Sequence, residues 1–331
     1  MQDKTDANQA LEEKVNKTVA EAKTDAEEPA TVAQGKAASA EPTASAEALT
    51  LYEMLLQTAA ADPDKEALRC KGARLSFADL LIEVDQLASA FRGCNVRKGT
   101  VMTVCLPNTL QTWICLLALN KIGAVASFLD SKISSDDLAA FLSKTGSECL
   151  LITDKNIPLY HDMLVARDPG LVIVCSACDY YFCLRRFLYR RLTRKIVPRI
   201  PDDEFYISYA RMRRFGKYVD FDNGEADYDW PGAFEDVKEP EAPKPYVRPV
   251  EPDETAVILP SRPESGTEYV GMTSTMIVDF AEQERKAPHS KDLPISSADR
   301  VKVRMLAELC RGTAFSLIPT MHDREEREQE K

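Results

Sequence analysis

Apolar positions along the body of this chain recur with the spacing of helices and of buried strands. The spacing predicts a helix over residues 51–59, which Asp62-Pro63-Asp64 ends. A second helix is predicted over 77–93, because Ser76 and Asp79 have the spacing of a reciprocal N-terminal cap. Its apolar stripe consists of Phe77, Leu80, Val84, Leu87, Ala88 and Phe91.

Short apolar runs and helical patterns then alternate as far as Cys175. The predicted strands are 101–106, 124–129, 149–153 and 171–175, and the predicted helices are 109–121, 135–146 and 158–166. Asn108 is expected to cap the first of these helices. The alternation is typical of an α/β protein, in which a parallel sheet carries helices on both faces. Ligands of such sheets bind beyond the carboxyl ends of the strands.

The pattern weakens after Cys175. Residues 183–199 hold seven basic residues and no acidic one, and residues 200–254 are rich in Tyr, Asp and Pro. Such a composition predicts an extended crossing and not a packed element. We therefore expect 49–331 to form one incomplete domain, in which 183–256 are a basic helix and a Pro-rich crossing. The remaining predicted elements are a strand at 257–259, a helix at 301–309 and a strand at 313–318.

Residues 1–48 have a different composition from the rest. They contain thirteen Ala, ten Asp or Glu and five Lys, and no aromatic residue. Because so little apolar surface cannot offset the entropy of ordering the chain, this segment is predicted to be a disordered acidic tail.

Composition and charge narrow the function classes. The net charge of −11 argues against a nucleic-acid-binding protein, because phosphate contacts need a basic surface. The sequence has no stretch of 18 uninterrupted apolar residues, so no membrane-spanning helix is predicted. The N-terminus lacks the basic and apolar regions of a secretory signal. Nine cysteines in such a chain are expected to be reduced thiols, so we expect a cytoplasmic protein.

The motif Cys175-Ser176-Ala177-Cys178 directly follows a predicted strand, where a redox dithiol would lie. Zinc would need a second ligand pair, and only Cys183 is near. We interpret these cysteines as buried small hydrophobic residues and expect no metal site. The motifs H-E-x-x-H, G-x-S-x-G and G-x-G-x-x-G are absent, so no catalytic residue is predicted.

A segment rich in Ser, Thr and Gly follows the predicted strand at 257–259. Backbone N–H groups and hydroxyls of such a segment can cradle phosphate. Two prolines and two glutamates interrupt it, and Glu264 and Glu268 repel phosphate while Arg262 is its only cation. The alternative is an ordinary surface turn. The candidate nucleotide-binding residues are Ser261, Arg262, Ser265, Gly266, Thr267 and Gly271.

Basic and apolar residues alternate over 185–199. On a helix they form an apolar stripe beside a cationic face, which predicts weak peripheral contact with an anionic membrane surface. The alternative is a helix that packs on the sheet and solvates its basic face.

The body of the chain resembles the N-terminal part of the AMP-binding (adenylate-forming) acyl-CoA synthetases and ligases. The resemblance is carried over 49–156 by LTLYEMLLQTAAADPDKEAL, ARLSFADLLIEVDQLASAF, VRKGTVMTVCLPNTLQTWICLLALNKIGAVASFLD and SSDDLAAFLSKTGSECLLITD, and more weakly over 250–319 from DETAVIL onward. It implies the fold of that family's N-terminal domain. It also implies the family's reaction, in which ATP activates a carboxylate to an acyl-adenylate and coenzyme A then forms the thioester, with ATP and Mg²⁺ as ligands.

The chain departs from that family's loop, Tyr-Thr-Ser-Gly-Thr-Thr-Gly-x-Pro-Lys-Gly. Aligning Ser265-Gly266-Thr267 with its Ser-Gly-Thr puts Met272 on the lysine, and aligning Gly266 with its second glycine puts Tyr269 there. The family's aromatic-Gly-x-Thr-Glu motif, its ribose-binding Asp and its C-terminal domain with a catalytic lysine are not found in this sequence.

We therefore interpret the chain as a truncated, degenerate relative of these ligases, a pseudoenzyme without a cofactor of its own. It is expected to act as a binding or regulatory partner, for example of an intact synthetase paralogue, and not to bind nucleic acid. The alternative is an ATP-dependent ligase that adenylates a fatty acid or a similar carboxylate and needs a second chain for the missing parts. A decayed reading frame is a further alternative.

Overall fold

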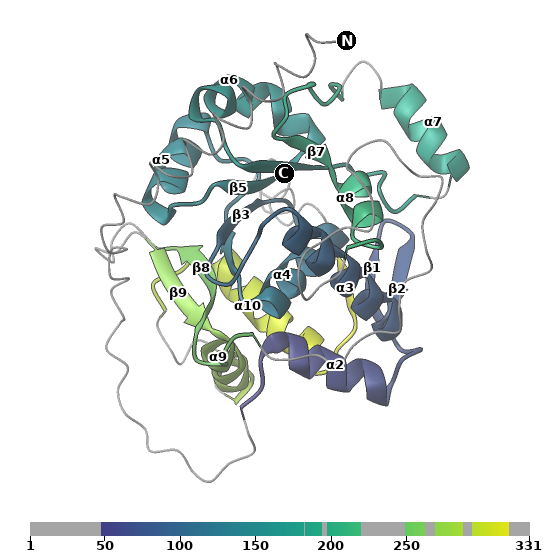
Figure 1. Cartoon of the computed structure of the whole chain (residues 1–331). Coiled ribbons are helices and arrows are strands. Elements are labelled where there is room, and N and C mark those ends of the chain that lie inside the picture. Colours follow the sequence, from purple (N-terminus) through teal and green to yellow (C-terminus); the bar gives the residue numbers. More distant parts are fainter. Residues whose placement is uncertain are drawn as a thin grey trace, which may run out of the picture. The chain divides into compact units, whose positions relative to one another are not determined.

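A computed structural model describes residues 48–181, 183–193, 197–219, 249–261, 269–286 and 293–317, and within these ranges seven strands form the main sheet (Figure 1). Their order is β7-β6-β5-β3-β4-β8-β9. Neighbouring strands run parallel, except that β8 and β9 form an antiparallel hairpin. The strands are β3 (Val101–Cys105), β4 (Val125–Phe128), β5 (Cys149–Thr153), β6 (Leu171–Cys175), β7 (Tyr206–Ser208), β8 (Thr255–Pro260) and β9 (Tyr269–Thr273).

Local sequence signals determine where several helices begin and end. Thr50 and Ser76 each cap a helix reciprocally with the acidic residue three positions on. Gly123 ends another helix in the left-handed conformation, with φ of 82°. The helices are α2 (Leu51–Ala61), α3 (Phe77–Gly93), α4 (Leu110–Ile122), α5 (Ser135–Thr145), α6 (Ile157–Arg167), α7 (Cys183–Thr193), α8 (Tyr209–Phe215), α9 (Ser274–Lys286) and α10 (Ser297–Cys310).

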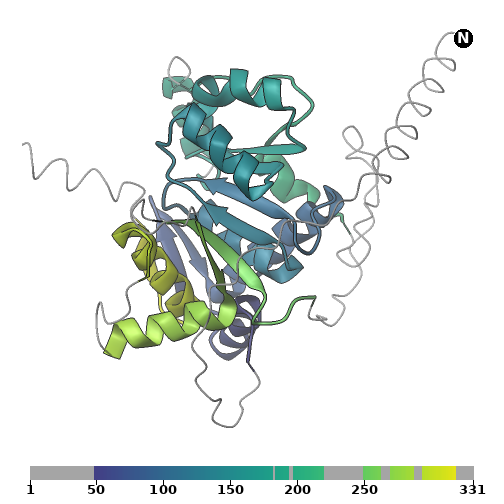
Figure 2. The same ribbon diagram turned by 90° about the vertical axis from the view of Figure 1, so that its left-hand side faces the viewer.

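Helices cover both faces of the main sheet, and a separate apolar core lies on each face (Figures 1 and 2). Successive residues of a strand point to opposite faces, so Leu150 and Ile152 of β5 join one core and Leu151 joins the other. The first core also contains side chains of α5 and α6. The second contains those of α2, α3, α4, α8, α9 and α10, and α4 is buried along its whole length.

A smaller sheet joins the beginning and the end of the described chain. β1 (Glu66–Cys70) pairs antiparallel with β2 (Ala73–Ser76) and parallel with β10 (Phe315–Leu317). Next to it, the Thr58 hydroxyl donates a 2.7 Å hydrogen bond to the carbonyl of Cys310, which lies 252 positions later. These contacts hold α2 and α10 together.

The predicted α/β class is confirmed, and the predicted elements up to Cys175 recur within a few residues of their predicted bounds. Two details are wrong. Thr109 precedes α4 as its N-cap, while the Asn108 side-chain oxygen instead accepts a 2.8 Å hydrogen bond from Trp113 Nε1. The extended crossing predicted over 200–254 is interrupted at 206–215 by β7 and α8. The predicted tail lies, apart from Ala48, outside the described residues.

Among the residues that the structure describes, none of the helices combines the length and the apolar character needed to cross a bilayer.

Candidate functional site

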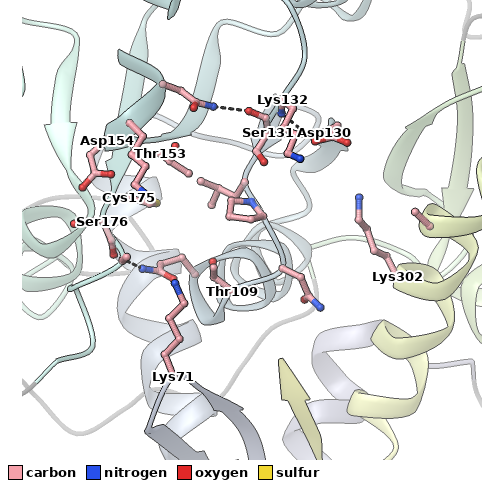
Figure 3. A pocket seen from close by; sticks show the side chains of 18 residues that line it. Lys71, Thr109, Asp130, Ser131, Lys132, Thr153, Asp154, Cys175, Ser176 and Lys302 are labelled. Atoms are coloured by element: carbon pink, nitrogen blue, oxygen red, sulfur yellow. Dashed lines mark hydrogen bonds between the residues drawn. The ribbon is translucent and has the colours of Figure 1, made fainter. Parts of the chain in front are cut away.

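A cavity of about 310 Å³ lies beyond the carboxyl ends of four parallel strands, β3 to β6. The segments that follow these strands line it, namely 106–109, 130–132, 153–156 and 175–177. Lys71 and Lys302 reach it from elsewhere, the first from the β1–β2 turn and the second from α10 (Figure 3). The cavity therefore lies where the alternation of strands and helices predicts a ligand.

The order of the strands explains why a crevice forms at this place. After β3 the chain adds β4 on one side, and then crosses back to add β5 on the other side of β3. The connections that leave β3 and β5 therefore diverge, and the space between them is the position at which open α/β sheets bind ligands. Residues 106–109 and 153–156, which follow these two strands, both line the cavity.

Hydrogen bonds between neighbouring loops hold the walls of the cavity in place. Asn156 donates through its side chain to the Ser131 carbonyl at 2.6 Å, which joins the loop after β5 to the loop after β4. Gln111 of α4 donates to the Ser176 carbonyl at 3.0 Å and to Asp179 at 3.2 Å, and Figure 3 shows the first of these bonds. Such a site is ordered before any ligand arrives.

Lysines outnumber carboxylates on the cavity walls. The lining contains Lys71, Lys132, Lys155 and Lys302, against Asp130 and Asp154. In a chain with a net charge of −11, this is a local reversal of sign that favours an anionic ligand.

Defined backbone and side-chain contacts hold two of these lysines in place. Lys71 and Gly72 form the two-residue turn between β1 and β2, both with positive φ (48° and 89°), as a tight hairpin turn with matching twist requires. The Lys302 ammonium lies 3.0 Å from an Asp299 carboxylate oxygen and 5.5 Å from the centre of the Phe128 ring. Both contacts orient its charge on the cavity side of α10.

Asp154 is a buried carboxyl group in the cavity wall, only 6% exposed. Burial raises its pKa above the usual value, while a hydrogen bond from Ser176 and the charge of Lys155 oppose this effect. The environment of this carboxyl group therefore disfavours its charged form.

The cysteines of the Cys-x-x-Cys motif are buried, 4% exposed for Cys175 and 1% for Cys178. Burial raises the pKa of Cys175 well above its usual value, which opposes thiolate chemistry. The interpretation of these residues as small core residues is confirmed. Within the described ranges, no three His, Cys, Asp or Glu side chains gather as metal ligands.

Most of the predicted phosphate loop lies outside the described residues, including Arg262, Ser265, Gly266 and Thr267. The structure places the flanking residues. Ser261 forms an isolated antiparallel bridge with Ile295, and Gly271 lies within β9, where it pairs with Ile258. The loop therefore joins the two strands of a hairpin, and its role as a nucleotide site stays a prediction.

The lysines of the cavity are not among the site residues predicted from the sequence. Lys132 and Lys155 closely follow predicted strands. Because ligands of parallel sheets bind beyond the carboxyl ends of the strands, these two lysines could have been predicted from the sequence. Lys71 and Lys302 are brought there by tertiary contacts, for which the sequence carries no comparable local signal.

Comparisons with known proteins agree with the predicted resemblance. Residues 55–209 match the family described as AMP-binding enzyme. The acetyl-coenzyme A synthetase of Xanthobacter autotrophicus is 30% identical over 118 residues, which are 34% of this chain and 18% of that protein. The crotonobetaine/carnitine–CoA ligase of Proteus mirabilis is 25% identical over 30% of this chain and 19% of that protein. The match thus spans less than a fifth of either relative.

Solved structures share the fold over most of the chain. The N-terminal domain of FACL13 from Mycobacterium tuberculosis, solved with an inhibitor, has a TM-score of 0.53 at 14% identity, covering 82% of this chain and 57% of that one. Coronafacic acid ligase from Pectobacterium brasiliense has a TM-score of 0.55 at 16% identity, covering 85% and 47%. At such identities the likeness concerns the fold alone.

Proposed function

Residues 55–209 match the AMP-binding enzyme family, and the relatives are named as synthetases and ligases of coenzyme A, so we propose that this chain is a member of that family that does not adenylate. It binds an acidic small molecule and acts as a binding or regulatory protein. The observation that supports this proposal is the composition of residues 261–268, which join β8 to β9 and read Ser-Arg-Pro-Glu-Ser-Gly-Thr-Glu.

The chemistry of this segment does not fit a bound triphosphate. Adenylation develops negative charge on phosphate oxygens, which cations and N–H donors have to stabilise. Here Arg262 is the single cation, Glu264 and Glu268 carry opposing charges, and Pro263 has no N–H to donate. The family's loop lysine has no counterpart in either alignment.

The cavity supports the binding part of the proposal. It keeps the ligand position of the fold, with ordered loops and an excess of lysines. The curated relatives are named as enzymes that join an acid to coenzyme A. Coenzyme A carries phosphates that such lysines attract, so it is the first ligand to test, followed by small carboxylates.

A protein that binds such a ligand without activating it lowers the concentration of free ligand that is available to an active enzyme. The partner we propose is an intact synthetase of the same family, which shares the ligand. Its activity, measured with limiting coenzyme A, is expected to fall in proportion to the added chain, and saturating coenzyme A is expected to restore it.

Isothermal titration calorimetry of the full chain tests the binding. Coenzyme A is expected to bind, and Lys302→Met is expected to weaken it about tenfold, since a hydrogen bond between charged groups contributes about 1.5–3 kcal/mol. Lys286→Met is the matched control, because Lys286 is an exposed lysine at the end of α9 and does not line the cavity. Absence of heat with coenzyme A and with carboxylates would contradict the proposal.

Titration with ATP and Mg²⁺, together with ATP–pyrophosphate exchange, tests the catalytic part. No exchange is expected with acetate, medium-chain or long-chain fatty acids. Exchange that Arg262→Ala abolishes would instead support the alternative, a ligase whose remaining parts lie on a second chain. Binding of ATP that Lys302→Met weakens and Arg262→Ala leaves unchanged would place ATP among the anions of the cavity.

A further inference from the structure

Helix α7 (Cys183–Thr193) presents apolar side chains to solvent. Phe187, Leu188 and Leu192 are 64%, 52% and 71% exposed. At about 100° per residue, these three side chains lie within an arc of about 140° on one side of the helix. They therefore lie on one exposed side of the helix, and we call these three residues the α7 strip.

The opposite side of α7 faces the protein. Tyr189 packs edge-on against Tyr181, with ring centres 5.8 Å apart, and burial raises the pKa of its hydroxyl. The Thr193 hydroxyl donates to the Tyr189 carbonyl at 2.8 Å, which supports the last turn. Figure 1 shows α7 at the outer edge of the domain. An amphipathic helix of a globular protein buries its apolar stripe, whereas α7 exposes these three apolar side chains.

The charge around the α7 strip is opposite to that of the whole chain. Residues 183–199 contain seven basic residues and no acidic one, although the net charge is −11. Arg191 is exposed and lies on the helix between Phe187 and Leu192, so cationic and apolar groups share one surface. A long arginine side chain can keep its charge at the level of headgroups while its stem lies along apolar neighbours.

We propose that α7 docks in the plane of an anionic membrane, with the α7 strip at the acyl boundary and the arginines on headgroup phosphates. Such a surface supplies both apolar contact and negative charge, which is the combination that basic interfacial helices recognise. This inference does not depend on the ligand of the cavity. Membrane binding and ligand binding in the cavity are therefore tested separately, and the outcome of one does not determine the outcome of the other.

Co-sedimentation of the full chain with vesicles tests the proposal. The chain is expected to bind vesicles of phosphatidylcholine with 30% phosphatidylserine, and not vesicles of phosphatidylcholine alone. Raising the salt concentration is expected to weaken binding, because ions screen the charge part. Arg190→Glu with Arg191→Glu is expected to lower the partition coefficient about thirtyfold or more, from roughly 1 kcal/mol for each basic residue. Phe187→Ser with Leu192→Ser is expected to abolish binding.

Two controls match these variants in exposure. Arg304→Glu reverses an exposed arginine on α10, and Ile82→Ser removes a side chain of α3 that is 54% exposed. Both are expected to bind as the unmodified chain does. Of the substituted residues, the structure describes Phe187, Leu192, Arg191, Arg304 and Ile82 as exposed, so unchanged thermal midpoints are expected. Leu192→Trp supplies an independent signal, a blue shift of its emission when anionic vesicles are added.

Three outcomes would overturn the proposal. The first is no binding to anionic vesicles, and the second is equal loss of binding in the control variants. The third is a dimer in sedimentation velocity, with no lipid binding, that Phe187→Ser with Leu192→Ser dissociates, because a second copy of the chain would then cover the α7 strip.

Discussion

Gly216 ends α8 directly against the backbone of α3, and its replacement by alanine is expected to force these two helices apart. Its backbone has ordinary right-handed torsion angles (φ −60°, ψ −15°), so conformation alone does not require glycine. Space does. A Cβ at this position would collide with the Gln86 carbonyl oxygen, lie 2.7 Å from the carbonyl carbon, and lie 3.1 Å from Ala90 Cβ.

The atoms in the way belong to the backbone of a long helix, so they cannot rotate aside as a side chain can. Relief requires α8 to move, and α8 holds Tyr209, Met212 and Phe215 in the core. Overpacking of this kind costs about 1–3 kcal/mol, and we expect the upper end because no flexible group can yield. For a body of this size, about 3 kcal/mol lowers the thermal midpoint by roughly 6–12 °C.

Three glycines provide an ordered series for thermal melts followed by circular dichroism. Gly93→Ala would meet the Phe215 ring at 2.8 Å and Val219 at 3.0 Å, both movable side chains, so a smaller loss is expected. Gly170→Ala would find its nearest atom at 3.9 Å and should be nearly neutral. The expected order of loss is Gly216, Gly93, Gly170. A Gly216→Ala variant that melts with Gly170→Ala would refute the close approach of α8 to α3.

Three further predictions concern titratable groups. Burial raises the pKa of Asp154, so the folded chain holds this proton more tightly than the unfolded chain. The charged carboxylate therefore destabilises the folded chain at neutral pH, and this effect vanishes as the pH falls below the unfolded-state pKa. Asp154→Asn should raise the thermal midpoint at neutral pH and leave it unchanged below about pH 4, in melts across that range. Arg213→Met leaves the Glu83 carboxylate, whose side chain is 8% exposed, without its ion pair. Because Arg213 itself is 37% exposed, we expect the free energy of unfolding in urea to fall by about 2 kcal/mol, less than for a fully buried pair. Adding Glu83→Gln is expected to restore part of this free energy. Burial raises the pKa of the Cys94 and Cys149 thiols to about 11, and of the eight cysteines whose side chains the structure describes, all except Cys94 are buried. Iodoacetamide at about pH 8 should therefore leave these eight cysteines unmodified in the native chain and modify all nine cysteines in denaturant, as mass spectrometry would show.

The fold of the first half is predictable because its signals are local. Ser76 with Asp79 marks a helix start, and the buried strands β3 to β6 appear as short apolar runs. The β1–β2 hairpin escapes prediction because Lys71-Gly72 is not the usual Asn-Gly pair of a tight turn. Helix α8 escapes because its sequence, YARMRRF, is polar, and the contacts of three buried side chains stabilise it.

The position of the site is predictable, whereas its charge is not. Strand ends locate the loops after β3 and β5, and the rule for parallel sheets then locates the cavity between them. Lys71 and Lys302 complete it only after the hairpin and α10 have packed. The Ser-, Thr- and Gly-rich composition of residues 261–268 favours a site there instead, because a sequence shows composition but not which residues lie close together in space.

Because β1 pairs with β10, its partner strand becomes available only late in the synthesis of the chain. Leu68 pairs with Phe315, and the hydrogen bond from Thr58 to Cys310 joins residues that are 252 positions apart in the chain. At about 5–20 residues per second, a ribosome needs roughly 12–50 s to make that interval. Throughout it the outer edge of β1, with its row of N–H and C=O groups, is complete and has no native neighbour. The nascent chain is therefore exposed to strand addition by other chains until its last described strand emerges, and a chaperone that shields this edge would act within that window.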